Sequence, residues 1–404
     1  MSQLTAGSTA PVRPSERADA RPEAPLAGRL DALDGLRGIA VLAVLGYHAH
    51  VGWLRGGYLG VDVFFVLSGF LITAQLLKTR ARRGTQSRSR MYGLFLAHRA
   101  TRLVPALLVM LAAAWVLAEP LGFATNATAC TVRAATYTMN VPGGGAESCP
   151  SQWHISWSLA AEVQFYSLIP IALFVLLSWL RGRVRRPLRA AALAVTGVLG
   201  LAFAWHAVLW LNPDNKLRFL FAPDGRSLIL LAGTAIALAL ADPWVRTRLL
   251  RRVRISAWPS RVAVLVLVVA LSRGQAHSGL SALLSLAAVG AATSLLLLAA
   301  LSGEAAVVPK VLTSGVLTWV GRVSYSLYLW HEIGYAAAHK LGLPDLRLTA
   351  VSGVVLAVAL AAVSYRWVEQ PALHGLRKLL PHPTGGAPKP ARTSLSRVSE
   401  AAAA

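Results

Sequence analysis

Charged residues are scarce in this sequence. They make up 14% of its 404 residues, against 55% hydrophobic residues, and the mean hydropathy is +0.54. Because soluble domains carry about 25% charged residues, the composition argues against the two or three soluble domains that this length allows. Nearly uncharged runs such as VAVLVLVVAL (262–271) and SLLLLAALSG (294–303) recur along the chain. They predict an all-α, polytopic integral membrane protein, because one membrane-spanning helix needs about 20 apolar residues.

Acidic residues are rarer still. The chain has 17 Asp and Glu against 40 Lys and Arg, which gives a net charge of +23. A surplus of this size could indicate a nucleic-acid-binding protein, but the basic residues gather in three short segments, 78–90, 181–189 and 246–254. Short basic loops on one side of a membrane set the orientation of membrane helices. We therefore predict no nucleic-acid partner and a lipid bilayer as the surroundings.

Only two cysteines occur, Cys130 and Cys149, which excludes a disulfide-rich scaffold. Both fall in the longest loop that is not basic, which the predicted topology places outside the cell. There a disulfide can persist, so we expect either a Cys130–Cys149 bridge or two free thiols. No Cys/His spacing typical of zinc and no G-x-x-x-x-G-K-[ST] phosphate loop is present, so the sequence predicts no metal site.

The apolar runs predict about ten spans in one membrane domain, 31–375. Residues 1–30 lack the apolar core of a signal peptide, and their polar composition predicts a disordered cytoplasmic arm. A second disordered segment is expected at 376–404. An even number of spans places both termini on the same side of the membrane. The basic segments that follow the second, fourth and sixth spans predict that this side is the cytoplasm. The expected spans are 36–53, 58–77, 103–119, 154–179, 190–210, 226–241, 259–272, 282–302, 312–338 and 347–369.

Two ionisable residues stand out in the first span, LDGLRGIAVLAVLGYHAH (33–50). Arg37 and His48 are eleven residues apart, which is about 16 Å along a helix. An ionisable residue inside a membrane is a functional-site hypothesis by default. The alternatives are a snorkelling anchor for Arg37 and a structural hydrogen bond to a neighbouring helix for His48.

Three further charges are candidates for the same site. Arg99 and Arg102 share a helical face where the third span leaves the cytoplasm, and two guanidiniums there can bind phosphate. Glu162 lies about two turns into the fourth span, at a depth that we expect to match that of His48. A buried carboxylate must be paired or protonated, so we predict that Glu162 orients His48. The alternatives are lipid headgroup contacts for the arginines and a structural Glu–Arg pair for Glu162.

Other polar and small residues are predicted to be structural. Gly60 and Gly69 permit close helix approach, and Asp62 is expected to cap a helix or contact a loop. Arg366 and Glu369 are spaced for a local salt bridge near the end of the last span.

Six stretches in this order resemble the acyltransferase 3 family of membrane O-acyltransferases. They cover about 31–375 and are LDGLRGIA…YH, GVDVFFVLSGFLIT, F-x3-R-x2-R-x2-P, WSLAAEVQFY-x3-P, SYSLYLWH and Y-x3-E-x-P. The resemblance implies acyl transfer from acyl-CoA to a hydroxyl, usually on a sugar. It also matches Arg37, His48, Arg99, Arg102 and Glu162 to the family's motif residues. One departure is that HEIG follows Trp330 without the usual proline, which makes a role for His331 less secure. Another is a tail expected to be too short for the esterase-like domain that many members add.

The predicted function is therefore O-acyl transfer at the cell membrane by a multi-pass protein, with acyl-CoA, most simply acetyl-CoA, as the donor substrate and no permanently bound cofactor. Arg37, Arg99 and Arg102 would hold the CoA phosphates, His48 would act as general base, and Glu162 would support it. The acceptor is expected to be a sugar hydroxyl of a cell-envelope glycan or glycolipid. The alternatives are a cytoplasmic small molecule, such as the sugar of a macrolide-type antibiotic, and, in other functional classes, a membrane transporter or a structural or sensory protein.

Overall fold

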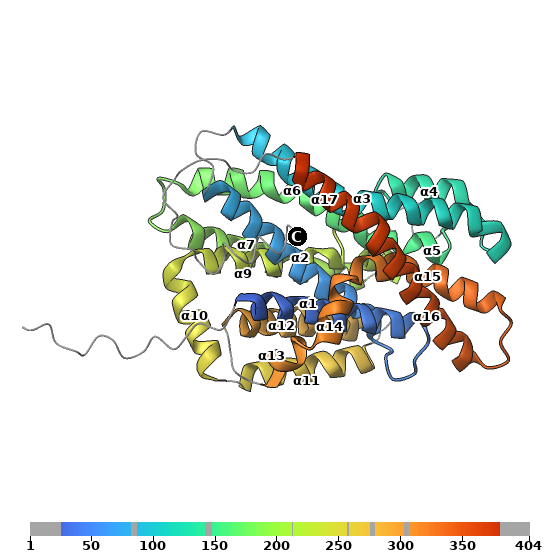
Figure 1. Cartoon of the computed structure of the whole chain (residues 1–404). Coiled ribbons are helices and arrows are strands. Elements are labelled where there is room, and N and C mark those ends of the chain that lie inside the picture. The colour runs from blue at the N-terminus through green and yellow to red at the C-terminus, as the bar shows by residue number, and fades with distance from the viewer. Residues whose placement is uncertain are drawn as a thin grey trace, which may run out of the picture.

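The computed structural model describes residues 26–81, 87–141, 148–211, 213–256, 258–274, 279–302 and 307–379, and over these ranges it is helical, without any strand (Figure 1). The predicted all-α class is confirmed. The helices are α1 (Leu26–His48), α2 (Gly60–Ala81), α3 (Arg88–Leu121), α4 (Ala127–Ala135), α5 (Ser151–His154), α6 (Ser156–Leu180), α7 (Pro187–Leu211), α8 (Lys216–Phe221), α9 (Leu230–Ala241), α10 (Pro243–Ile255), α11 (Trp258–Arg273), α12 (Gly279–Ser302), α13 (Val307–Leu312), α14 (Gly315–Arg322), α15 (Ser324–Lys340), α16 (Leu346–Ser364) and α17 (Gln370–Leu379). Short helical turns η2 (Gly57–Leu59), η5 (Arg226–Ile229) and η6 (Tyr365–Glu369) join some of them.

Within the described ranges, seven helical stretches are long and apolar enough to cross a membrane, and an eighth is possible if α10 and α11, which meet at a 78° bend, form one broken span. The count of ten is therefore not confirmed. Three of the expected spans fall short for physical reasons. Helix α1 carries Asp31, Asp34 and Arg37 in its first half, and α11 and α15 have only 16 and 17 residues. The ninth expected span, 312–338, is interrupted at Val323 between α14 and α15.

The segment boundaries also shift. Helix α1 begins at Leu26, so the last five residues of the expected arm 1–30 are helical, and α17 continues to Leu379, inside the expected tail 376–404. The remainder of the arm and the tail lies outside the described residues. The third basic segment, 246–254, lies in helix α10 rather than in a loop. Asp242 caps this helix by accepting hydrogen bonds from the backbone N–H groups of Trp244 and Val245.

Helix α1 runs through the middle of the molecule, with α12 and α14 beside it (Figure 1). Small residues bring α1 and α14 to backbone contact. A Cβ atom on Gly38 would collide with the carbonyl oxygen of Leu317, and one on Gly321 would collide with that of Asp34. Glycine at both positions therefore fixes α1 against α14 and, through the chain that follows, near α15.

Two glycines hold α2 in the same way. A Cβ on Gly60 would meet the Ala40 carbonyl oxygen of α1, and one on Gly69 would meet the Leu230 carbonyl oxygen of α9. A Cβ on Gly233 of α9 would likewise collide with the Val66 carbonyl oxygen of α2. The prediction that Gly60 and Gly69 permit close helix approach is confirmed.

Cys130 and Cys149 form a disulfide, which confirms the bridge and excludes the two free thiols. The bond joins α4 to the segment just before α5. Trp153 is fully buried beneath this region, and its indole N–H donates to the Thr131 hydroxyl at 2.9 Å. The bridge therefore ties α4 to the segment that leads through α5 into α6, the helix that carries Glu162.

Candidate active site

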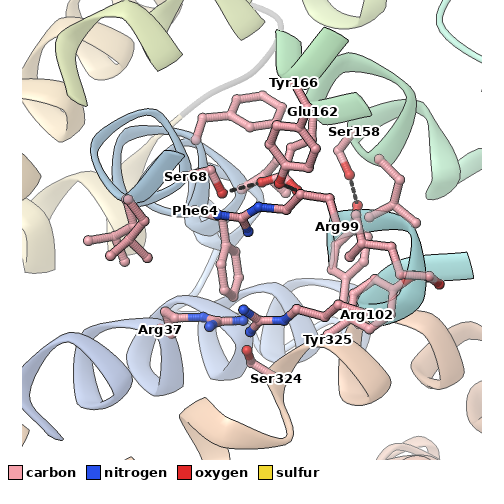
Figure 2. A pocket seen from close by; sticks show the side chains of 17 residues that line it. Arg37, Phe64, Ser68, Arg99, Arg102, Ser158, Glu162, Tyr166, Ser324 and Tyr325 are labelled. Carbon is pink, nitrogen blue, oxygen red and sulfur yellow. Dashed lines mark hydrogen bonds between the residues drawn. The ribbon is translucent and has the colours of Figure 1, made fainter. Parts of the chain in front are cut away.

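Three arginines from two helices line one cavity. Arg37 comes from α1, and Arg99 and Arg102 come from α3, one turn apart. Their guanidiniums face the cavity, and those of Arg37 and Arg102 point toward one another (Figure 2). The space between these side chains is about 730 Å³, counted together with the solvent at its open mouth. The predicted grouping of these three residues is present in the structure.

Aromatic and amide groups hold Arg99 in place. Its guanidinium donates to the Gln75 side-chain oxygen at 3.2 Å and stacks 5.2 Å from the centre of the Tyr166 ring. The cavity lining contains three arginines and one carboxylate, that of Glu162. With three positive charges and one negative charge, the lining carries a net charge of +2 and attracts anions.

Glu162 does not reach His48. Its two oxygens accept hydrogen bonds from the Ser68 hydroxyl of α2 and, at 2.7 Å, from the Tyr166 hydroxyl one turn along α6. The carboxylate lies beside Arg99, on the side of the cavity opposite Arg37 and Arg102 (Figure 2). The predicted Glu162–His48 pairing is therefore wrong, because α6 packs its Glu162 face on α2, whereas His48 faces α15.

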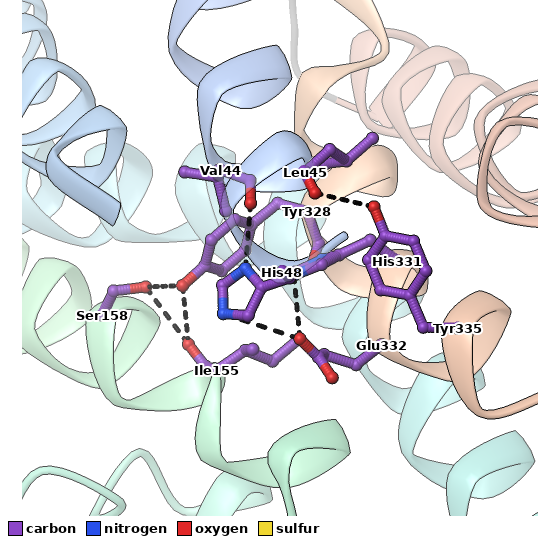
Figure 3. Close-up of polar contacts among 9 residues, drawn as sticks. All are labelled: Val44, Leu45, His48, Ile155, Ser158, Tyr328, His331, Glu332 and Tyr335. Carbon is purple, nitrogen blue, oxygen red and sulfur yellow. Dashed lines mark hydrogen bonds and ion pairs between the residues drawn. The ribbon is translucent and has the colours of Figure 1, made fainter. Parts of the chain in front are cut away.

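His48 instead faces Glu332. Its Nε2 atom lies 3.6 Å from Glu332 Oε1, and the Nε2 atom of His331 lies 3.4 Å from the same oxygen (Figure 3). The Nδ1 atom of His48 is 2.9 Å from the Val44 carbonyl oxygen of the preceding turn. A carbonyl only accepts, so this Nδ1 carries the hydrogen and Nε2 keeps its lone pair in the neutral ring. Because Nε2 lies against Glu332, the imidazole faces α15.

Sequence reasoning assigned no role to Glu332. The available signal was the sequence HEIG after Trp330, which was noted only for its missing proline. Glu332 is a carboxylate inside a predicted apolar span, and its side chain is 9% exposed. Such a residue is itself a functional-site hypothesis.

Tyr328 and Ser158 connect the two groups of residues. Both line the arginine cavity, and their hydroxyls lie 2.8 Å apart. The backbone oxygen of Tyr328 accepts a hydrogen bond from His331 Nδ1 at 2.7 Å. The cavity wall is therefore in direct contact with the cluster formed by His48, His331 and Glu332 (Figure 3).

Two further predictions concern structural ion pairs. Asp62 does not cap a helix with its side chain: it is fully buried and lies 3.2 Å from the buried guanidinium of Arg226, in the short turn η5 that connects α8 to α9. The expected Arg366–Glu369 pair is not formed between these described side chains. Arg366 is exposed, and Glu369 accepts a hydrogen bond from the Ser326 hydroxyl at 2.8 Å.

Comparison with known proteins identifies the same family along the chain. Residues 30–366 match an acyltransferase domain. The peptidoglycan O-acetyltransferase OatA of Listeria monocytogenes is 29% identical over 359 residues, which cover 84% of this chain and 55% of that protein. The Bacillus subtilis protein named "Putative peptidoglycan O-acetyltransferase YrhL" is 28% identical, over 84% of this chain and 54% of that protein. The chain thus spans about half the length of the curated relatives it matches. No solved structure matches it. Since the matched domain covers most of the chain, the protein belongs to the acyltransferase 3 family.

Proposed function

We propose that the protein transfers an acetyl group from acetyl-CoA to a sugar hydroxyl of a cell-envelope glycan, at the plasma membrane. One observation carries the proposal: helix α1 presents Arg37 to a cavity with two further arginines and, eleven residues later, turns His48 inward beside Glu332. The two positions on α1 are about 16 Å apart, a separation that suits a donor with phosphates at one end and a thioester at the other.

The arginine cavity is proposed to bind the phosphates of CoA. Guanidiniums form bidentate hydrogen bonds with phosphate. The guanidiniums of Arg37 and Arg102 point toward one another, and a phosphate bound between them would interact favourably with both positive charges. Arg99, held by Gln75 and Tyr166, needs little reordering to contact such an anion. The remainder of the donor then extends along α1 past Tyr328 toward His48.

His48 is proposed to act as the general base. Its Nε2 atom takes the proton of the acceptor hydroxyl as the hydroxyl oxygen attacks the thioester carbonyl. The new C–O ester bond forms, the C–S bond breaks, and the imidazolium returns its proton to the departing CoA thiolate. Glu332, 3.6 Å from Nε2, stabilises the imidazolium in place of Glu162. A route in which His48 is first acylated gives the same products.

The choice of acceptor rests on the relatives, one of which is named for O-acetylation of peptidoglycan. The test is mass spectrometry of envelope glycans from cells with and without the gene, fed deuterated acetate. The proposal predicts an acetyl ester on a glycan fragment that disappears with the gene and returns with wild-type protein, but not with His48→Ala. Glycans that are identical in all strains, together with an acetylated small molecule lost from the cytoplasm, would assign the acceptor elsewhere.

A further inference from the structure

The cluster of His48, His331 and Glu332 brings together three atoms that are metal ligands in other proteins. The two Nε2 atoms lie 3.6 Å and 3.4 Å from Glu332 Oε1, and one ligand atom from each residue lies within 4.8 Å of the others. The residues come from α1 and α15 (Figure 3). Sequence spacing predicted no metal site, because spacing compares neighbours within one segment, whereas these ligands come from helices far apart in the chain.

The backbone determines which atoms of the two rings face the cluster. His48 Nδ1 lies 2.9 Å from the Val44 carbonyl oxygen, and His331 Nδ1 lies 2.7 Å from that of Tyr328. Both Nδ1 atoms therefore donate, which leaves both Nε2 atoms with lone pairs when the rings are neutral. Two lone pairs then face a carboxylate oxygen, which is itself rich in electron density.

This arrangement lacks a positive centre. His331 Nε2 and Glu332 Oε1 are buried and have no hydrogen-bond partner among the described residues. Leaving buried polar atoms unpaired is costly. Protonation of His331 would supply a donor to Glu332, but it would not involve the Nε2 atom of His48, which faces the same oxygen. A cation placed between the three atoms would satisfy them all.

We propose that His48, His331 and Glu332 bind a divalent transition-metal ion of the zinc class. Zinc bonds to these ligands are about 2.0–2.1 Å long, so adjacent donors around a tetrahedral ion lie about 3.3–3.4 Å apart. The two contacts to Glu332 are close to that spacing. The carbonyl groups of Val44 and Tyr328 orient the rings, as second partners of metal-bound histidines do. Calcium and magnesium are not expected, because they prefer oxygen ligands.

The site is also accessible to an ion. The side chain of His48 is 30% exposed, whereas those of His331 and Glu332 are 0% and 9% exposed. An ion can therefore arrive on the His48 side and reach all three ligand atoms. Three protein ligands leave a fourth position open for water.

A bound metal ion would also affect acetyl transfer. This effect, unlike the binding itself, rests on the proposed function. A metal ion on Nε2 takes the lone pair that His48 needs as a base. Zinc is therefore expected to inhibit acetyl transfer, and a chelator is expected to restore it.

Zinc chloride titrated against a chromophoric chelator tests the site in purified full-length protein without a polyhistidine tag. We expect one tightly bound ion per chain, and binding at least about tenfold weaker in Glu332→Gln and in His331→Gln. His98→Gln is the matched control. The His98 ring also contacts the carbonyl oxygen of the preceding turn, that of Leu94, but it lies outside the cluster. This variant should bind zinc like the wild type.

X-ray absorption of the zinc-loaded wild type gives a second measurement that needs no variant. Two imidazoles and one carboxylate around zinc would support the proposal. Wild-type protein that retains no ion against the chelator, or Glu332→Gln that binds as tightly as wild type, would overturn it. Tight binding at this site without inhibition of transfer would instead count against His48 as the base, which keeps the two proposals separable.

Discussion

Glu332 Oε1 lies 3.6 Å from His48 Nε2, although the two residues belong to helices near opposite ends of the chain. The contact places a carboxylate beside the proposed base and leaves Glu162 to the arginine cavity. The family resemblance pointed to His48 and to Glu162 but not to Glu332. The His48–Glu332 contact therefore predicts a role for Glu332 in catalysis, which the motif residues alone do not predict.

Glu332→Gln is expected to lower kcat for acetyl transfer by about a hundredfold, because the neutral amide no longer stabilises the imidazolium of His48. The KM for acetyl-CoA should change little, because Glu332 does not line the arginine cavity. Steady-state release of CoA thiol, measured with EDTA present, checks both constants. Glu119→Gln, an exposed carboxylate on α3, is the control. Equal kcat values in Glu332→Gln and wild type would remove Glu332 from the mechanism.

Arg102→Gln and Arg99→Gln are each expected to raise the KM for acetyl-CoA by about ten- to a hundredfold. A hydrogen bond to a charged group contributes about 1.5–3 kcal/mol, and 1.4 kcal/mol is a factor of ten. The same loss should appear as weaker binding of CoA by calorimetry. Arg366→Gln removes an equal charge from an exposed position outside the cavity and should leave the KM unchanged. A drop in kcat with no change in CoA binding would argue against a phosphate site.

Asp62→Asn is expected to destabilise the fold by about 3–5 kcal/mol, because it leaves the Arg226 guanidinium buried without its counter-charge. Thermal unfolding in detergent measures the loss. Replacing both partners with apolar residues, Asp62→Leu with Arg226→Met, should recover much of it, since a buried ion pair contributes little net stability. A double variant as unstable as the sum of the single variants would show that the two residues act independently.

Gly69→Ala is expected to destabilise the protein by about 1–3 kcal/mol, since the added Cβ collides with the Leu230 carbonyl oxygen and forces α2 away from α9. Gly200→Ala is the matched control, because a Cβ at that position of α7 meets no atom within 4 Å. It should be neutral or stabilising by up to about 1 kcal/mol. Melting temperatures that fall equally in both variants would contradict the close α2–α9 packing.

Several features of the fold were predictable from the sequence because they depend on local chemistry. Apolar runs identified the helical class, and the three-residue spacing of Arg99 and Arg102 placed both on the cavity face of α3. Gly60 and Gly69 marked close helix approaches. The number of spans was not predictable, because the length of an apolar run does not determine the length of the helix that contains it. Helix α1 carries charged residues in its first half, and α15 has only 17 residues.

The pairing within the site was predicted wrongly, because similar depth in a membrane does not determine which helices meet. Glu162 was assigned to His48 on depth alone. Its position depends instead on how α6 is turned against α2, where Ser68 and Tyr166 supply hydroxyl donors. Glu332 was not predicted, because nothing in the HEIG stretch of the sequence shows that this carboxylate faces His48 of a helix far away in the chain.

The most direct measurement of the central claim is release of CoA thiol by His48→Ala, compared with wild type at saturating acetyl-CoA and a glycan acceptor. Calorimetry should first show that the variant still binds CoA with wild-type affinity, since the arginine cavity is intact. The account then predicts no thiol release above the rate without enzyme. Thiol release at the wild-type rate by His48→Ala would contradict it.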